Sequence, residues 1–196
     1  FNTISVSDFD ITNMTLIHLG SITLKRVSLS GKSSSEYLMK TDGSLIQDLN
    51  LNSVTFTGSY LTIEGLKASI TDSTINCSKG FGALLSKSFS LTTSSIDSGL
   101  YDSDFDIQYD ATVTITGSTI NAKNITFYSS LLVDENDYLH NKENQSLDIK
   151  NSTFKASGDI FVEDIYATTF TDFTIESTKS FNVSTSSRFI ASPMVL

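Results

Sequence analysis

The stretch Ile115-Thr116-Gly117-Ser118-Thr119-Ile120 decides the fold of this chain, because close variants of it return through most of the sequence. Each variant begins with an apolar residue, continues with a polar pair, and ends on a Ser/Thr step into Ile, Phe or Leu. The variants occupy residues 24–29, 51–56, 70–75, 91–96, 115–120, 149–154 and 170–175, and residues 11–16 match more loosely. A phrase that returns at intervals is the signature of a repeat protein.

The residues that close these phrases are apolar and define the length of the repeat. They are Leu29, Phe56, Ile75, Ile96, Ile120, Phe154 and Ile175. The gaps between them are 27, 19, 21, 24, 34 and 21 residues, so a unit of about 20 residues recurs and the longer gaps contain insertions. A second apolar phrase with period-two alternation, such as 61–63 or 125–127, follows most closing residues and indicates further short strands.

A unit of this length cannot bury its own apolar row, whereas stacked units bury a continuous column. We therefore expect an all-β fold, a right-handed parallel β-helix (β-solenoid) with coils of about 20 residues, in which the seven closing residues form one inward core ladder. The alternative is an antiparallel β-sandwich, which also has short alternating strands. Against the sandwich, Asp42-Gly43 is the only Asn-Gly or Asp-Gly hairpin dipeptide in the chain.

The repeat pattern favours a single domain over residues 1–196, which we expect to be a segment of a longer solenoid or a self-assembling unit. The charged residues of the longest gap predict a projecting loop at 129–146, and residues 30–42 are a second loop candidate. The terminal segments 1–20 and 188–196 are apolar and do not resemble polar caps, so we expect them to dock on neighbours. Because the two terminal segments differ from each other, we expect head-to-tail self-association into a filament, or continuation of the solenoid.

On these repeats, the sequence resembles the right-handed parallel β-helix proteins, an architecture shared by pectin-lyase-like enzymes and many surface adhesins. The segment Gly80-Phe81-Gly82-Ala83-Leu84-Leu85 also resembles the Gly-Gly-Ala-Ile phrase of polymorphic outer-membrane-type repeats. The resemblance implies the same stacked fold over residues 20 to 185, and it transfers no catalytic residue to this chain.

Composition narrows the classes of function. The net charge is −9, and only 13 Lys and Arg residues are present, so we expect no nucleic-acid partner. No apolar stretch is long enough for a membrane span. Ser and Thr number 33 and 24, a share that suits outward ladders of small polar side chains. Cys77 is the only cysteine, and alternation from Ile75 predicts that it is a small buried residue.

Candidate chemical sites are few. Asp102, Asp104 and Asp106 alternate like calcium ligands, but Ile107 and Val113 replace the Gly and Glu of an EF-hand loop, so we favour a strand with Phe105, Ile107 and Tyr109 inward. The repeat phrases carry only the distant carboxylates Asp72 and Asp172, so we expect no enzyme, no resident metal and no cofactor. His18 and His140 have no partner at ligand spacing and are interpreted as surface or packing residues.

Six Asn-x-Ser/Thr sequons are the most useful local signal, and they indicate an extracellular or cell-surface glycoprotein. The candidate glycosylation sites are Asn13, Asn76, Asn124, Asn144, Asn151 and Asn182. The expected function is that of a structural, rod- or filament-forming subunit. The alternatives are a carbohydrate- or host-binding adhesin and a divergent polysaccharide-active enzyme. Tyr101, Tyr109, Tyr128 and Tyr138 are the aromatic candidates for contact with a carbohydrate partner.

Overall fold

A computed structural model of the chain describes residues 3–7, 10–12, 20–30, 36–39, 46–98, 105–109, 112–129, 145–177 and 179–195. All of the regular secondary structure in these residues is β-strand. The strands are β1 (Thr3–Ser7), β2 (Asp10–Thr12), β3 (Ser21–Lys25), β4 (Ser28–Ser30), β5 (Glu36–Met39), β6 (Ile46–Asn52), β7 (Thr55–Thr71), β8 (Thr74–Thr92), β9 (Ser95–Asp97), β10 (Phe105–Tyr109), β11 (Thr112–Thr116), β12 (Thr119–Ala122), β13 (Ile125–Ser129), β14 (Ser146–Lys150), β15 (Thr153–Ala156), β16 (Asp159–Ser177) and β17 (Ser180–Val195).

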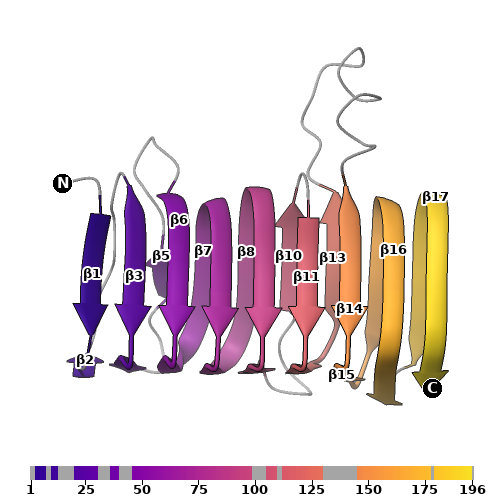
Figure 1. The fold of residues 1–196 in the computed structure, drawn as a ribbon. Helices are drawn as coiled ribbons and strands as arrows, with labels where there is room; N and C mark the ends of the chain where they lie inside the picture. The colour runs from indigo at the N-terminus through magenta and orange to yellow at the C-terminus, as the bar shows by residue number, and fades with distance from the viewer. Residues whose placement is uncertain are drawn as a thin grey trace.

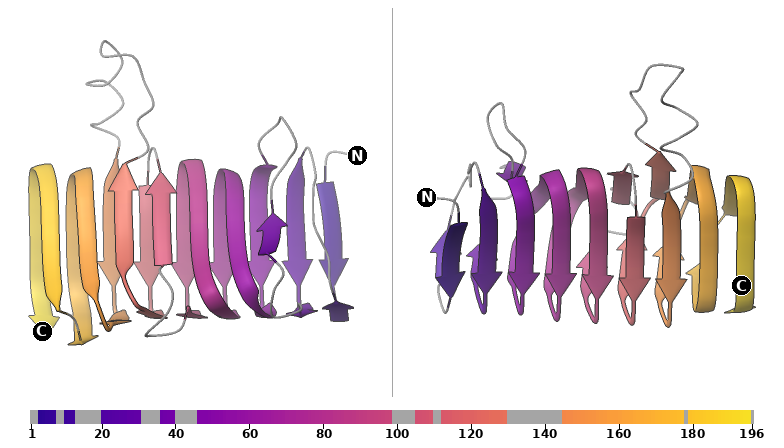
Figure 2. Two further views of the ribbon diagram at one scale, coloured as in Figure 1. Left: turned by 180° about the vertical axis from the view of Figure 1, so that it is seen from behind. Right: turned by 45° about the horizontal axis from the view of Figure 1, so that its top comes forward.

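Every strand pairing among the described residues is parallel, which excludes the antiparallel β-sandwich. Each strand pairs with the strand that occupies the same place in the next repeat, as β7 does with β8 and β16 does with β17. Figure 1 shows the strands side by side in chain order, with β1 and β17 at opposite ends, and Figure 2 shows the same order from behind. The chain is therefore all-β with a parallel, repeat-by-repeat register.

The residues that close the repeat phrases lie in one register column. Each pairs with the next one along the chain, as Phe56 does with Ile75 and Ile120 does with Phe154. All seven are at most 5% exposed, and Ile75, Ile96 and Ile120 are fully buried. The column therefore runs through the core from β4 to β16.

A sharp corner precedes each closing residue, and its geometry explains the polar pair in the phrase. The second residue of the pair has a positive φ in all seven repeats: Arg26, Ser53, Asp72, Thr93, Gly117, Asn151 and Asp172 have φ between 48° and 59°. The backbone N–H groups of the first six donate to carbonyl groups of the next repeat, as Asp72 does to Thr92 at 3.1 Å. Inter-repeat hydrogen bonds thus continue through the corner without interruption.

The next corner residue points inward, and in four consecutive repeats it is serine. Ser73, Ser94, Ser118 and Ser152 are buried. The backbone N–H of Val54, Ser73, Ser94 and Ser118 donates to the Oγ of the following serine at 3.0, 3.1, 3.2 and 3.2 Å respectively. Each Oγ in turn donates to the carbonyl two residues earlier, as Ser94 does to Thr92 at 2.7 Å. This serine ladder satisfies polar groups that would otherwise be buried without partners.

Phenylalanines fill the C-terminal half of the core. Phe81 stacks on Phe105 with ring centroids 5.2 Å apart, and Phe127 stacks on Phe154 at 5.9 Å. Phe173 takes the corner position that serine holds in earlier repeats, and it contacts Phe154 edge-on at 4.7 Å. The interior therefore changes from a polar corner to an aromatic one near β16.

Several expected loops and termini are only partly described. The second loop candidate, residues 30–42, contains strand β5, which pairs with β7, so expecting a loop throughout this range was wrong. Residues 130–144 of the 129–146 loop lie outside the described residues, and β13 and β14 flank them. Residues 188–195 are the end of β17 and pair with β16. Docking of segments 1–20 and 188–196 on neighbours stays a prediction.

Candidate functional site

Two outward surfaces of the sheet differ in the side chains that they present. The first, the hydroxyl face, lies on β6, β11, β14 and the second halves of β7, β8 and β16. Each of four strands presents two outward hydroxyl residues that lie in register with those of the other strands. They are Ser69 and Thr71 on β7, Ser90 and Thr92 on β8, Thr114 and Thr116 on β11, and Thr169 and Thr171 on β16. These side chains are partly exposed and uncharged. The face is therefore mainly an array of hydroxyl groups, interrupted by Asp148 and Lys150 of β14 and by Asp48 of β6 and Lys67 of β7, which form an ion pair at 3.9 Å.

The second surface, the glycine face, lies on β5, β10, β13 and the adjoining parts of β7, β8, β16 and β17. Its outward positions on β7 and β8 are Tyr60 and Thr62 opposite Gly80 and Gly82. Leu84 follows on β8, and Tyr60 and Leu84 are 42% and 43% exposed. They are the exposed large hydrophobic residues of the described part of the chain. This face combines bare backbone with apolar side chains.

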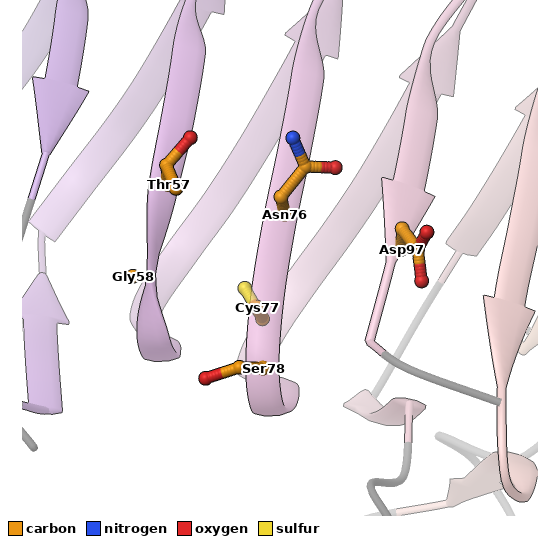
Figure 3. A pocket seen from close by; sticks show the side chains of 6 residues that line it. All are labelled: Thr57, Gly58, Asn76, Cys77, Ser78 and Asp97. Atoms are coloured by element: carbon orange, nitrogen blue, oxygen red, sulfur yellow. The ribbon is translucent and has the colours of Figure 1, made fainter. Parts of the chain in front are cut away.

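A shallow hollow lies near the start of β7, β8 and β9. Thr57, Gly58, Asn76, Cys77, Ser78 and Asp97 line it (Figure 3). Thr57, Asn76 and Asp97 occupy one register column on three neighbouring strands. The lining residues are small, and apolar atoms form most of the lining surface. Asn76, which belongs to a sequon, is exposed at this hollow.

Cys77 forms the inner wall of this hollow, and it is 1% exposed. The pKa of its thiol is raised from 9.0 to about 12. Desolvation by burial is the largest cause and raises it, a hydrogen bond with the Leu61 backbone lowers it, and the nearby Asp97 carboxylate raises it. The thiol is therefore neutral at physiological pH and a poor nucleophile. The expectation that Cys77 is a small buried residue is confirmed.

The sequon asparagines have different surroundings. Asn76, Asn151 and Asn182 are exposed, and Asn151 is one of the positive-φ corner residues. Asn124 is partly buried, and its Oδ1 accepts a hydrogen bond from the Asp159 backbone N–H at 2.9 Å. Asn13 and Asn144 lie outside the described residues.

The structure does not bring the acid candidates Asp72 and Asp172 together, and it describes one of the three calcium candidates. Asp106 lies on β10 opposite Gly82 and Thr126, whereas Asp102 and Asp104 lie outside the described residues. Asp72 and Asp172 are exposed corner residues, and the corners at Thr93, Gly117 and Asn151 separate them. In the described residues there is no group of three His, Cys, Asp or Glu side chains that could hold a metal ion.

The remaining candidates are histidines and tyrosines. His18, His140, Tyr101 and Tyr138 lie outside the described residues. Tyr109 shares its register position with the buried Leu85. Tyr128 is partly exposed on the glycine face, where it pairs with Glu163.

The most exposed aromatic residue of the glycine face, Tyr60, was missed by the sequence reasoning. The signal was present, because Gly80 and Gly82 occupy alternate positions of an otherwise regular strand. Glycine inside a strand often marks a place where a ligand or another backbone approaches closely.

Comparison with known proteins gives no relative on which to base a function. No family model, no curated protein and no solved structure matches the chain. In the described residues there is also no helix long and apolar enough to cross a membrane.

Proposed function

We propose that this protein is an extracellular structural glycoprotein whose right-handed parallel β-solenoid associates head to tail into rods. The observation that carries the proposal is the outer edge of β17. Among the described strands, β17 pairs only with β16, so one row of its backbone groups faces away from the sheet. Unpaired strand edges recruit further strands unless they are covered.

The strand register supports an open solenoid over a closed barrel. Each repeat pairs with the repeat before it and the repeat after it, and β1 pairs with β3 whereas β17 pairs with β16. A closed barrel would require its first and last strands to pair with each other. The right-handed winding is the usual hand of parallel crossovers, and it completes this proposal.

The core at the β17 end is apolar and partly open. Phe181 contacts the rings of Phe170 and Phe173 with centroids 5.7 and 6.4 Å apart. Phe181 and Val183 are nevertheless only partly buried. A second copy, or a further repeat of a longer chain, would pair with this edge and cover both side chains. Because the β1 and β17 ends differ from each other, such a contact between copies is head to tail and propagates.

Light scattering and negative-stain microscopy of the isolated 196-residue chain test the assembly. We expect rods whose mass increases with concentration. Val183→Lys, which places a charge at the open end of the core, abolishes them. Asn182→Lys is the matched control, because it adds the same charge to an exposed position of the same strand. A chain that stays monomeric at high concentration contradicts head-to-tail association.

Glycosylation is tested separately. We expect sugar on at least two of the six sequons, with Asn76, Asn151 and Asn182 as the exposed described sites. Intact mass with and without glycosidase treatment, on protein purified from its native source, measures the occupancy. Unmodified asparagine at all six sites contradicts the extracellular assignment and leaves the assembly test unaffected.

A further inference from the structure

Gly82 has no internal reason to be glycine. It lies in a regular part of β8, where residues 80–85 pair with residues 60–65 without a register shift. No atom lies within 4 Å of the place where its Cβ would be, and its φ is not in the left-handed region. Glycine inside a strand costs stability relative to residues with a side chain, and it often marks a place where a ligand or another backbone approaches closely.

Tyr60 and Leu84 flank this bare backbone on the same outward face. Tyr60 lies opposite Gly80, and Leu84 lies two positions after Gly82 on the same strand. Both side chains are more than 40% exposed, whereas the inward residues Leu61 and Ala83 beside them are buried. Two independent departures from the pattern, a missing side chain and two exposed apolar ones, thus meet at one place. We call the surface formed by Tyr60, Thr62, Gly82 and Leu84 the Gly82 platform.

The dimensions and chemistry of the platform limit its occupant. From Tyr60 to Leu84 the platform runs about 13 Å along the strand, from four residues at about 3.3 Å each. It is too small for a stable protein interface, which needs about 800 Å² from each partner. The backbone at Gly82 carries no side chain between the exposed Tyr60 and Leu84, so the platform suits a ligand that lies along the strand. The hydroxyl of Thr62 beside Gly82, and that of Thr126 two strands away in the same register column, add hydrogen-bonding groups.

We propose that the Gly82 platform binds a neutral polysaccharide chain, with a sugar ring lying over the Gly82 backbone and its apolar face against the Tyr60 ring. Tyrosine offers an apolar ring with a polar edge, which suits a sugar that has the same two characters. The net charge of −9 and the exposed Glu163 on the same face disfavour a polyanionic glycan. This site goes beyond the proposed rod-forming role and does not depend on it.

Titration calorimetry with neutral hexasaccharides tests the platform. The probes are β-1,4-glucan, β-1,3-glucan and chitin hexasaccharides, with polygalacturonate as the polyanionic comparison. We expect at least one neutral probe to bind, and Tyr60→Ala and Gly82→Thr each to raise its Kd at least about tenfold. Because the space above Gly82 is open and threonine favours strands, Gly82→Thr is expected to fold at least as stably as the wild type.

Ser90→Thr is the matched control, because it adds a methyl group at an outward position of the same strand on the hydroxyl face. It should leave the Kd unchanged. The proposal is overturned if no neutral probe binds, if polygalacturonate binds as well as the neutral probes, or if Gly82→Thr binds like the wild type. Loss of self-association in Gly82→Thr would also overturn it, since the platform would then be a contact between copies. All titrations are run below the concentration at which light scattering detects assembly, so this result and that of the rod test are independent.

Discussion

The corner that precedes each closing residue and the glycine face lie on the same repeats, yet one repeats its sequence and the other does not. At the corner, a positive-φ residue and an inward residue recur in all seven repeats, and the inward residue is serine in four of them. Across the glycine face, the register column of Gly82 reads Leu38, Thr62, Gly82, Asp106, Thr126, Phe161 and Asn182. The contrast shows that repetition follows the demands of the backbone, and that positions free of those demands differ from repeat to repeat.

The largest expected effect comes from a charge in the column of closing residues. Ile120→Asp buries an unpaired carboxylate at a fully buried position and should cost about 4 kcal/mol or more of the free energy of unfolding. Thr119→Asp is the control, because it places the same carboxylate on the neighbouring exposed residue, where we expect about 0.5 kcal/mol. Urea denaturation followed by circular dichroism measures both, and equal effects would show that the column is not the core.

Breaking the serine ladder tests the corner directly. Ser118→Ala removes the Oγ that accepts from the Ser94 backbone N–H, and leaving that buried donor unpaired should cost about 2 kcal/mol. Thr119→Ala removes an exposed hydroxyl from the adjacent residue and should change stability by less than about 0.5 kcal/mol. If the two variants unfold at the same urea concentration, the ladder contributes nothing beyond packing.

Alkaline pH distinguishes Cys77 from the hydrogen-bonded serines of the interior. Its thiol pKa is raised from 9.0 to about 12 in the folded state. Below pH 9 the thiol is protonated in both states, and between the two values only the unfolded chain loses the proton, so stability falls as pH rises. In that window the free energy of unfolding should fall by about 1.4 kcal/mol per pH unit more than it does in Cys77→Ala. The variant is the reference because the other groups titrate equally in both proteins and their effects cancel in the difference. Parallel stability curves for the two proteins from pH 8 to 11 would contradict the raised pKa.

Exchanging the residue types of two corner positions tests whether the positive φ limits which residues the corner accepts. Thr93 is a β-branched residue with φ 48°, whereas Asn151 holds the equivalent corner with the same φ. Asparagine tolerates this region and β-branched residues do not, so Thr93→Asn should stabilise the fold by about 1 kcal/mol and Asn151→Thr should destabilise it similarly. Midpoints of thermal unfolding measure the signs, and two changes in the same direction would show that φ is not the cause.

The smallest effect concerns a hydroxyl that lacks what the ladder provides. Thr168 is fully buried on β16, and its Oγ1 has no hydrogen-bond partner. Thr168→Val keeps the shape and removes the unsatisfied group, so we expect a gain of about 1 kcal/mol. Ser94→Val is the comparison, because it also introduces valine but removes a hydroxyl that is hydrogen-bonded, and it should be destabilising. A gain in stability from Ser94→Val would show that hydrogen bonding does not distinguish the two hydroxyls.

The parallel strand register could be predicted from the sequence because the seven closing residues are the same chemical type at recurring intervals. Their column could be predicted because a buried position accepts few residue types, and these seven are all apolar. The positive φ at the corners was not predicted, because Arg26, Ser53, Asp72 and Thr93 share no residue type that marks that conformation. Strand β5 was missed because the surrounding residues are polar and its pairing with β7 is a contact that local pattern cannot show. The exposed pair of Tyr60 and Leu84 likewise depends on which strand lies opposite which.

The positive-φ corners also form a row of regularly spaced positions. From Arg26 to Asp172, seven exposed residues of six types follow one another at the strand spacing of about 4.8 Å, so the first and last are about 29 Å apart. The backbone accepts arginine, serine, aspartate, threonine, glycine and asparagine there, so the side chain can be exchanged while the interval stays fixed by hydrogen bonds. Cysteines introduced at chosen corners would hold dyes, catalysts or epitopes at distances graduated in single strand steps.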